Sequence, residues 1–443
     1  MKVYFVSLGC DKNSVDSEVM LGALADAGFT FTDDESQAEA CVVNTCCFIN
    51  DAKKESIDTL IELGNRRKSG QLKALVACGC LAQRYTDDIH KMIPEVDALV
   101  GIASIEHIAD ALNSVLRGNP RDYIDSTDIK IHGNHHRIVT TGGYFDYLKI
   151  AEGCNKRCTY CVIPYVRGNY RSIPIEELVD EAKQLVSGGV RELNLVAQET
   201  SVYGIDLYGQ KSLPKLLKEL CKIDELKWIR ILYCYPEEIT DELIDCIASE
   251  PKIVHYLDMP IQSGSDAVLK KMGRKTNRAE ISELIAKLRK KIPDICLRTT
   301  LISGFPGESH KDHIETLNMV RELEFDRLGA FTYSREEGTP AATMKGQVPE
   351  FIKKRRFKEI MSLQQGIAFK KTEGIVGRRL LCMIEGLIPE ERVYVARTYR
   401  DAPDVDGYLF VNSDRELMSG DMVLVDVTDT NEYDLIGEFY EFA

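Results

Sequence analysis

The chain has 443 residues and a formal net charge of −14, with 44% hydrophobic and 28% charged residues. This composition is ordinary for a globular protein and excludes a mostly disordered one, and the length predicts about two to four domains. No run of about 18 apolar residues is present, which excludes a membrane-spanning helix. Because the chain is acidic overall, it is a poor default binder of nucleic acid or of an anionic membrane. The apolar start that leads to Cys10 is too short for a secretory signal, so we expect a cytoplasmic protein without a membrane partner.

The amino-terminal part of the chain alternates between apolar runs and helical patterns. The helical patterns begin near Ser14, Asp51 and Leu81. The apolar runs predict strands at 3–8, 40–43, 73–77 and 98–100. This alternation predicts a parallel sheet with helices on both faces, and we place this α/β domain at residues 1–125. The His-rich stretch 132–136 that follows is predicted to be a solvated linker.

The alternation resumes with longer units in the middle of the chain. Strands are predicted at 147–151, 192–197, 228–232, 256–259, 297–302 and 328–333. Six β/α units of this length predict a partial or complete (β/α) barrel, which we place at residues 140–370. A basic helix is predicted over 351–371, and its run Lys353-Lys354-Arg355-Arg356 is predicted to be a solvated helix face.

The carboxy-terminal residues change to short, alternating, β-branched runs. Strands are predicted at 379–384, 392–397, 408–411, 422–427 and 435–440. Five strands in so short a segment predict a small antiparallel β-barrel at residues 375–443.

Three of the fourteen cysteines form a dense group, Cys154-x₃-Cys158-x₂-Cys161, between a predicted strand and a helix. Three thiolates at this spacing can bind one [4Fe–4S] cluster and leave its fourth iron open. A structural zinc would need a fourth ligand nearby at a regular spacing, and none is present. The spacing resembles that of the radical S-adenosylmethionine (SAM) superfamily. Isolated cysteines elsewhere are predicted to be small buried apolar residues, namely Cys221, Cys234, Cys246, Cys296 and Cys382.

The resemblance to the radical SAM superfamily implies that SAM binds the open iron and is cleaved to a 5′-deoxyadenosyl radical. It also implies that Tyr160 lies beside the adenine. The stretch Ile302-Ser303-Gly304-Phe305-Pro306-Gly307-Glu308 ends a predicted strand, and its glycines permit close approach to the backbone. We therefore expect a SAM-binding site that is formed by Tyr160, Ile302, Gly304, Pro306 and Gly307.

A second group of cysteines is spread over the amino-terminal domain. Cys10, Cys46 and Cys80 each follow a predicted strand, and the carboxyl ends of parallel strands share one edge of a sheet. The three thiols therefore either converge at that edge or are scattered core cysteines. Cys47 remains a further candidate, whereas Cys41 and Cys78 fall within strands.

Three segments of this domain resemble the amino-terminal domain of methylthiotransferases. They are Leu8-Gly9-Cys10-Asp11-Lys12-Asn13-Ser14-Val15-Asp16, Asn44-Thr45-Cys46 and Gly79-Cys80-Leu81-Ala82-Gln83-Arg84. The carboxy-terminal barrel resembles the TRAM domain, so the resemblance covers nearly the whole chain. It implies an α/β protein with two [4Fe–4S] clusters, of which Cys10, Cys46 and Cys80 hold the auxiliary one. No catalytic side chain is expected beyond the two clusters.

Two substrates compete within this family, an adenosine in tRNA and an aspartate of small-subunit ribosomal protein twelve. Residues 375–443 contain six Arg, no Lys and fifteen Asp or Glu, a net charge of −9. Such a tail repels RNA and attracts a basic ribosomal protein. Residues 397–407 and 198–204 resemble segments of the ribosomal-protein enzymes, with mild departures at Glu199 and Val202. We expect the ribosomal protein to be the substrate, bound through the acidic TRAM domain.

The resemblance also implies the reaction. One SAM donates a methyl group to sulfur at the auxiliary cluster, and a second yields the radical that removes hydrogen from the β-carbon of the aspartate. This radical chemistry implies an electron donor such as flavodoxin or ferredoxin. The alternatives are a tRNA-modifying enzyme and a non-catalytic iron–sulfur module that binds ribosomes.

Overall fold

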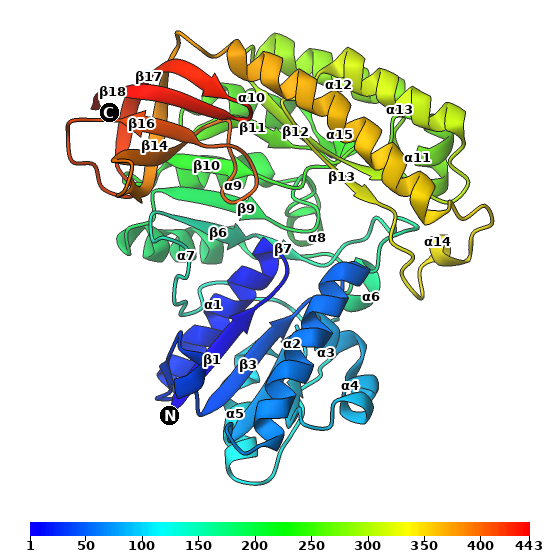
Figure 1. Cartoon of the computed structure of the whole chain (residues 1–443), viewed down its shortest axis with the longest axis vertical. Helices are drawn as coiled ribbons and strands as arrows, with labels where there is room; N and C mark the ends of the chain where they lie inside the picture. The colour runs from blue at the N-terminus through cyan, green and yellow to red at the C-terminus, as the bar shows by residue number, and fades with distance from the viewer.

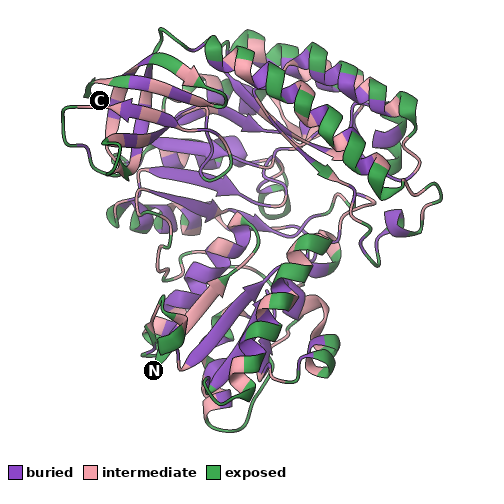
Figure 2. Ribbon diagram, in the orientation of Figure 1, coloured by how far each residue is buried: buried purple, intermediate pink, exposed green.

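The apolar runs of the amino-terminal domain form a five-stranded parallel sheet. The computed structural model describes all residues from 1 to 443, and Figure 1 shows this domain in blue and cyan. Its strands are β1 (Lys2–Ser7), β2 (Thr30–Phe31), β3 (Ala40–Thr45), β4 (Ala74–Gly79) and β5 (Ala98–Val100), in the order β2-β1-β3-β4-β5. Every residue of β3 and β4 is buried, because separate apolar clusters cover the two faces of the sheet (Figure 2).

Helices cover both faces of this sheet, as predicted. They are α1 (Asp11–Asp26), α2 (Asn50–Lys68), α3 (Cys80–Arg84), α4 (Thr86–Met92) and α5 (Ile108–Leu116), with short 3₁₀ turns η1 (Glu35–Gln37) and η2 (Ile105–His107). Helix α1 is rich in charged residues, yet much of it is buried. The reason is that α1 also lies against β6 of the next domain, so its polar side is enclosed as well.

The central domain is an open six-stranded parallel sheet, so the barrel is partial. Its strands are β6 (Phe145–Lys149), β9 (Glu192–Val196), β10 (Trp228–Ile231), β11 (Ile253–Asp258), β12 (Cys296–Ser303) and β13 (Arg327–Thr332), in the order β13-β12-β11-β10-β9-β6. All six predicted strands are confirmed. A short antiparallel pair, β7 (Ala151–Glu152) and β8 (Arg171–Ser172), lies beside the first cysteine of the dense group.

Most helices of this domain pack on the outer face of the sheet over a core of 49 buried residues, whereas α6 packs against the amino-terminal domain and α14 packs beside Phe305. The helices of the domain are α6 (Ile163–Val166), α7 (Ile175–Ser187), α8 (Ile205–Tyr208), α9 (Leu213–Cys221), η3 (Pro236–Glu238), α10 (Asp241–Ser249), α11 (Asp266–Met272), α12 (Arg278–Lys291), α13 (His310–Leu323), α14 (Pro340–Thr343) and α15 (Glu350–Glu373). Figure 1 shows α12, α13 and α15 side by side along the outside. No helix of the chain is both long enough and apolar enough to cross a membrane.

The carboxy-terminal segment forms a closed five-stranded barrel that is not purely antiparallel. Its strands are β14 (Arg379–Ile388), β15 (Val393–Thr398), β16 (Leu409–Asn412), β17 (Met422–Asn431) and β18 (Asp434–Phe442), in the order β14-β15-β16-β18-β17. Strands β16 and β18 pair in parallel, which corrects the prediction of an antiparallel barrel. Strand directions cannot alternate around a closed ring with an odd number of strands, so at least one pair must be parallel.

The prediction that the basic run of α15 is a solvated helix face is correct for only two of its four residues. Lys354 and Arg355 are exposed, whereas Lys353 and Arg356 are buried. The Lys353 ammonium donates to the Tyr333 carbonyl at 2.7 Å, and Arg356 pairs with Glu308 at 2.7 Å. Partners far away in sequence make burial of these two cations favourable.

The isolated cysteines are buried except Cys221, which is partly exposed.

The His-rich stretch forms neither a helix nor a strand, as predicted, and the linker crosses α1 closely. A Cβ at Gly22 would lie 2.1 Å from the His136 carbonyl oxygen, so this crossing requires glycine.

Candidate iron–sulfur and cofactor site

The structure brings Cys10, Cys46 and Cys80 to one edge of the amino-terminal sheet. They follow β1, β3 and β4, which are neighbours in that sheet. A Cβ added to Gly9, whose φ is +102°, would lie 2.8 Å from the Cβ of Cys46, so the first two loops are in direct contact. Burial raises the pKa of the Cys80 thiol, and the neighbouring Cys46 and Cys10 raise it further.

The chemistry of these thiols fits a polynuclear cluster. No three His, Cys, Asp or Glu side chains lie close enough together to bind a single metal ion, and all fourteen cysteines are free. Thiolates that each bind a different iron of a [4Fe–4S] cube lie farther apart than the ligands of one ion. Burial raises the pKa of Cys46, so a positive partner is needed to hold it as a thiolate.

The Cys154–Cys161 loop lies at the carboxyl ends of the central strands. Backbone N–H groups are directed at its sulfurs: that of Lys156 lies 3.5 Å from the Cys154 Sγ and lowers its pKa, although burial raises that pKa to about 11 overall. Arg157, at the centre of the loop, has φ +51°, a strained conformation for a residue with a side chain. Backbone N–H donors such as that of Lys156 are typical partners of thiolates that ligate iron–sulfur clusters.

The two cysteine sets face each other across the boundary between the domains. Tyr233, just after β10, donates through its hydroxyl to the Asp11 carboxylate at 3.2 Å, and Asp11 adjoins Cys10. The Lys12 ammonium lies 3.0 Å from the centre of the Tyr233 ring. Two residues along, the Tyr235 hydroxyl lies 3.7 Å from the Cys158 Sγ. One short segment of the central domain therefore contacts Cys158 and the two residues that follow Cys10.

The residues expected to bind SAM lie together near the cysteine loop at the carboxyl ends of the central strands. This region is called the mouth of the central domain. The rings of Tyr160 and Phe305 are in edge contact with centroids 6.4 Å apart, so the cysteine loop touches the Gly304–Gly307 turn. The protein itself, however, approaches these glycines. A Cβ at Gly304 would lie 2.3 Å from the Lys353 side chain, and one at Gly307 would lie 2.6 Å from the Lys271 ammonium. The positive φ of each glycine thus serves packing, and the predicted SAM contacts remain predictions.

Several polar residues at this mouth were not among the predicted site residues. Buried polar atoms without a hydrogen-bond partner occur on Gln198, Glu199, Gln262 and Arg274. Because such atoms are costly to leave unpaired, they mark a place where a polar ligand fits. Burial raises the pKa of Glu199 to about 7. The Arg274 guanidinium lies over the Tyr235 ring at 4.1 Å. In the sequence, Gln198, Glu199 and Gln262 are marked only by a position soon after a strand, which is a weak signal. Arg274 follows helix α11 and lacks even this signal.

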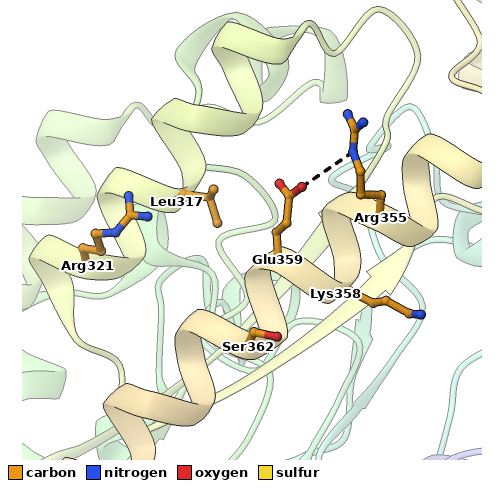
Figure 3. A pocket seen from close by; sticks show the side chains of 6 residues that line it. All are labelled: Leu317, Arg321, Arg355, Lys358, Glu359 and Ser362. Atoms are coloured by element: carbon orange, nitrogen blue, oxygen red, sulfur yellow. Dashed lines mark ion pairs between the residues drawn. The ribbon is translucent and has the colours of Figure 1, made fainter.

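A hollow of about 460 Å³ on the outer surface contains none of these residues. Figure 3 shows it between α13 and α15, with the Arg355–Glu359 ion pair on one side. Its lining residues are mostly charged and belong to two exposed helix faces. We assign it no part in the site.

Comparisons with known proteins agree with the three-domain fold. Family models match residues 2–101 ("Uncharacterized protein family UPF0004"), 148–320 ("Radical SAM superfamily") and 376–439 ("TRAM domain"). The solved structure of the radical SAM methyltransferase TsrM from Kitasatospora setae is similar, with a TM-score of 0.56, 14% identity, and 77% of this chain and 76% of that chain covered. At this identity the likeness shows the fold alone. The class defined by fold and site is therefore a radical SAM protein with an added amino-terminal domain and a TRAM barrel.

Relatives of much higher identity define the family. The ribosomal protein uS12 methylthiotransferase RimO of Lachnoclostridium phytofermentans is 58% identical over 437 residues, and 99% of each chain is covered. The protein of the same name from Geobacter sulfurreducens is 46% identical, with 99% of this chain and 98% of that protein covered. The chain belongs to the family of ribosomal protein uS12 methylthiotransferases.

Proposed function

We propose that this chain transfers a methylthio group to the β-carbon of an aspartate in ribosomal protein uS12. The observation that carries this proposal is the match, at 44% to 58% identity over 99% of the chain, to relatives that bear this activity in their names. An unactivated C–H bond has no useful acidity, so a side-chain base cannot remove its hydrogen.

Two [4Fe–4S] clusters are part of the proposal. Cys154, Cys158 and Cys161 would hold one, and Cys10, Cys46 and Cys80 the other. When bound, the first cluster would pass an electron from the donor to SAM, SAM would supply the radical and the methyl group, and the second cluster would hold the sulfur that is transferred. The protein supplies position: Tyr233, Asp11 and Lys12 hold the domains together at the point where the two cysteine sets face each other.

The SAM site would be formed by Tyr160, Ile302, Gly304, Pro306 and Gly307, as the superfamily resemblance implies. The unpaired polar atoms of Glu199, Gln262 and Arg274 add hydrogen-bonding capacity at the same mouth. Phe305 and Tyr333, whose ring centroids are 5.5 Å apart, close the apolar side and exclude water.

The TRAM barrel would bind uS12 through its acidic surface. Nine of its fifteen acidic residues are exposed, against four of its six arginines. Ribosomal proteins are basic because they contact RNA, so this surface attracts such a partner. The segment 397–407 has a different task, since Arg397, Asp401 and Ala402 are buried against the central domain.

The electron donor would be an acidic carrier such as flavodoxin or ferredoxin. Arg157 of the cysteine loop is exposed, and so are Lys270, Lys271 and Lys275 of the segment that this loop contacts. Thr159 of that loop donates to the Lys271 and Met272 carbonyls at 2.8 and 2.9 Å. Lys270→Glu with Lys275→Glu should slow reduction by flavodoxin but leave reduction by dithionite unchanged. Equal slowing with both reductants would contradict this assignment.

We place the protein in the cytoplasm, where ribosomes are assembled. The reconstituted, reduced chain should convert SAM to 5′-deoxyadenosine and add one methylthio group to purified uS12. Methylthiolation of tRNA instead would support the first alternative, and no 5′-deoxyadenosine at all would support the non-catalytic module.

A further inference from the structure

Asn13 connects all three cysteine loops of the amino-terminal domain. Its side-chain amide donates to the Leu8 carbonyl at 2.9 Å and to the Thr45 carbonyl at 3.1 Å, which belong to the loops of Cys10 and Cys46. Its side-chain oxygen lies 3.8 Å from the Sγ of Cys80. The residue is almost completely buried, so these contacts are shielded from water.

Arg167 of the central domain reaches this same residue. Its guanidinium donates to the Asn13 side-chain oxygen and pairs with Asp16 at 3.1 Å. It also pairs with Glu152, two residues before Cys154, at 2.8 Å. The backbone next to Arg167 continues the link, because the Gly168 carbonyl accepts from the Cys154 N–H at 3.1 Å.

The contacts that link the Cys80 loop to the Cys154 loop are rigid, because they are buried and because the guanidinium that makes them is planar. Only 1% of the Arg167 surface is exposed, and the guanidinium is planar with donors in a fixed arrangement. Val162, just before α6, and Val166, the last residue of α6, pack into the same apolar cluster as Cys47 and Cys80. Helix α6, which follows Cys161, is thus docked on the domain that carries Cys10, Cys46 and Cys80.

We propose that Asn13 and Arg167 are positioning residues that hold the Cys10, Cys46 and Cys80 loops in one geometry and fix that geometry relative to the Cys154–Cys161 loop. The inference rests on the proposed function, because positioning matters only if both sets carry clusters. The positive charge of Arg167 would also favour the reduced form of a cluster held by these cysteines, because that form carries one more negative charge.

Arg137 provides a matched control. Its guanidinium is equally buried and also joins α1 to the central domain, through Glu18 at 2.6 Å and Asp146 at 2.9 Å. It makes no contact with a cysteine loop in the structure. Arg137→Met therefore removes a buried charge from the same domain boundary without disturbing the Asn13 contacts.

The test uses the full chain with Cys154, Cys158 and Cys161 replaced by Ala, so that any cluster bound is the auxiliary one. In this chain Arg167→Met should shift the reduction potential of the cluster to a more negative value and change its electron paramagnetic resonance spectrum. Arg137→Met should do neither. Unchanged potential and spectrum in Arg167→Met at full iron content, or the same changes in Arg137→Met, would overturn the inference. Absence of iron from the parent chain would overturn the second cluster itself.

A second measurement needs no cluster. In the iron-free chain, Arg167→Met should increase the alkylation rate of Cys46 and Cys80 several-fold, while Cys41 in the middle of β3 keeps its rate. Arg137→Met should leave all three rates unchanged. Equal acceleration of Cys41 would show general unfolding and would contradict the positioning role.

Discussion

Arg397 of the TRAM barrel and Glu192 of the central sheet form an ion pair with 2.7 Å between nitrogen and oxygen, and neither side chain has any exposed surface. Glu192 also accepts from Arg230 at 2.9 Å, and Arg230 donates to the Tyr399 carbonyl. The two arginines lower the pKa of the Glu192 carboxyl despite its burial. The barrel is therefore fixed to the inner face of the sheet and is not a freely attached module.

Removing Arg397 should destabilise this joint strongly. Arg397→Met leaves a buried carboxylate with one partner fewer, and breaking such a pair costs about 3–5 kcal/mol of unfolding free energy. Thermal or denaturant unfolding would measure the loss. Arg379→Met, which breaks the half-exposed Arg379–Asp426 pair on the outer barrel surface, is the control and should change stability far less. Equal effects of the two variants would contradict a buried joint.

The two cysteine sets should separate into two activities. Cys154→Ala should abolish 5′-deoxyadenosine formation, because the site that binds and reduces SAM is lost. Cys46→Ala should retain some 5′-deoxyadenosine formation but stop methylthiolation entirely. Cys41→Ala, which replaces a buried cysteine within β3, should preserve both products. Chromatography of the reaction mixture measures the nucleoside, and persistent methylthiolation in Cys46→Ala would exclude that residue as a cluster ligand.

Glu199 should make stability depend on pH. Its pKa lies near 7 because it is buried, above the usual 4.5, although Lys156 nearby lowers it while Glu238 raises it. The fold therefore favours the protonated form, a contribution that is complete below about pH 4.5 and lost as pH rises through 7. Glu199→Gln should be increasingly more stable than the native chain from pH 5 to 8, by up to about 3 kcal/mol. Thermal midpoints of the SAM-free proteins would test this, and Glu62→Gln on the exposed face of α2 should show no such trend.

The acidic barrel surface should control the encounter with uS12. Asp414→Lys with Glu416→Lys reverses two exposed charges on the loop after β16. We expect a several-fold lower kcat/KM for uS12, mostly through slower association, and a weaker dependence on salt. Asp58→Lys with Glu62→Lys makes the same change on α2, far from the barrel in the chain, and should have little effect. If both pairs act alike, overall charge and not the barrel surface governs binding.

The regular elements could be predicted because their patterns are local. Six central strands and five barrel strands were recognisable from alternating or continuous apolar runs, and Cys80 could be placed at a strand end for the same reason. The parallel pairing of β16 with β18 follows from closure of the ring, which is a property of the whole barrel. Burial of Lys353 was not predictable, because its partner, the Tyr333 carbonyl, comes from a different element.

The predictable part of the site was the set of residues with distinctive chemistry. Cysteines are rare, so six of them could be predicted as ligands: Cys154, Cys158 and Cys161 from their spacing, and Cys10, Cys46 and Cys80 from their positions after strands together with the family resemblance. Asn13 and Arg167 are common residue types, and only the docking of α6 on the amino-terminal domain brings them together. Contacts across a domain boundary leave no periodic signal in either segment.

The substrate assignment can be tested by the intact mass of uS12 from cells with and without this gene. We expect that uS12 loses one methylthio group in the deletion strain, that the gene restores it, and that methylthiolation of tRNA stays unchanged. An unchanged uS12 mass, together with loss of the methylthio group from a tRNA adenosine, would contradict it.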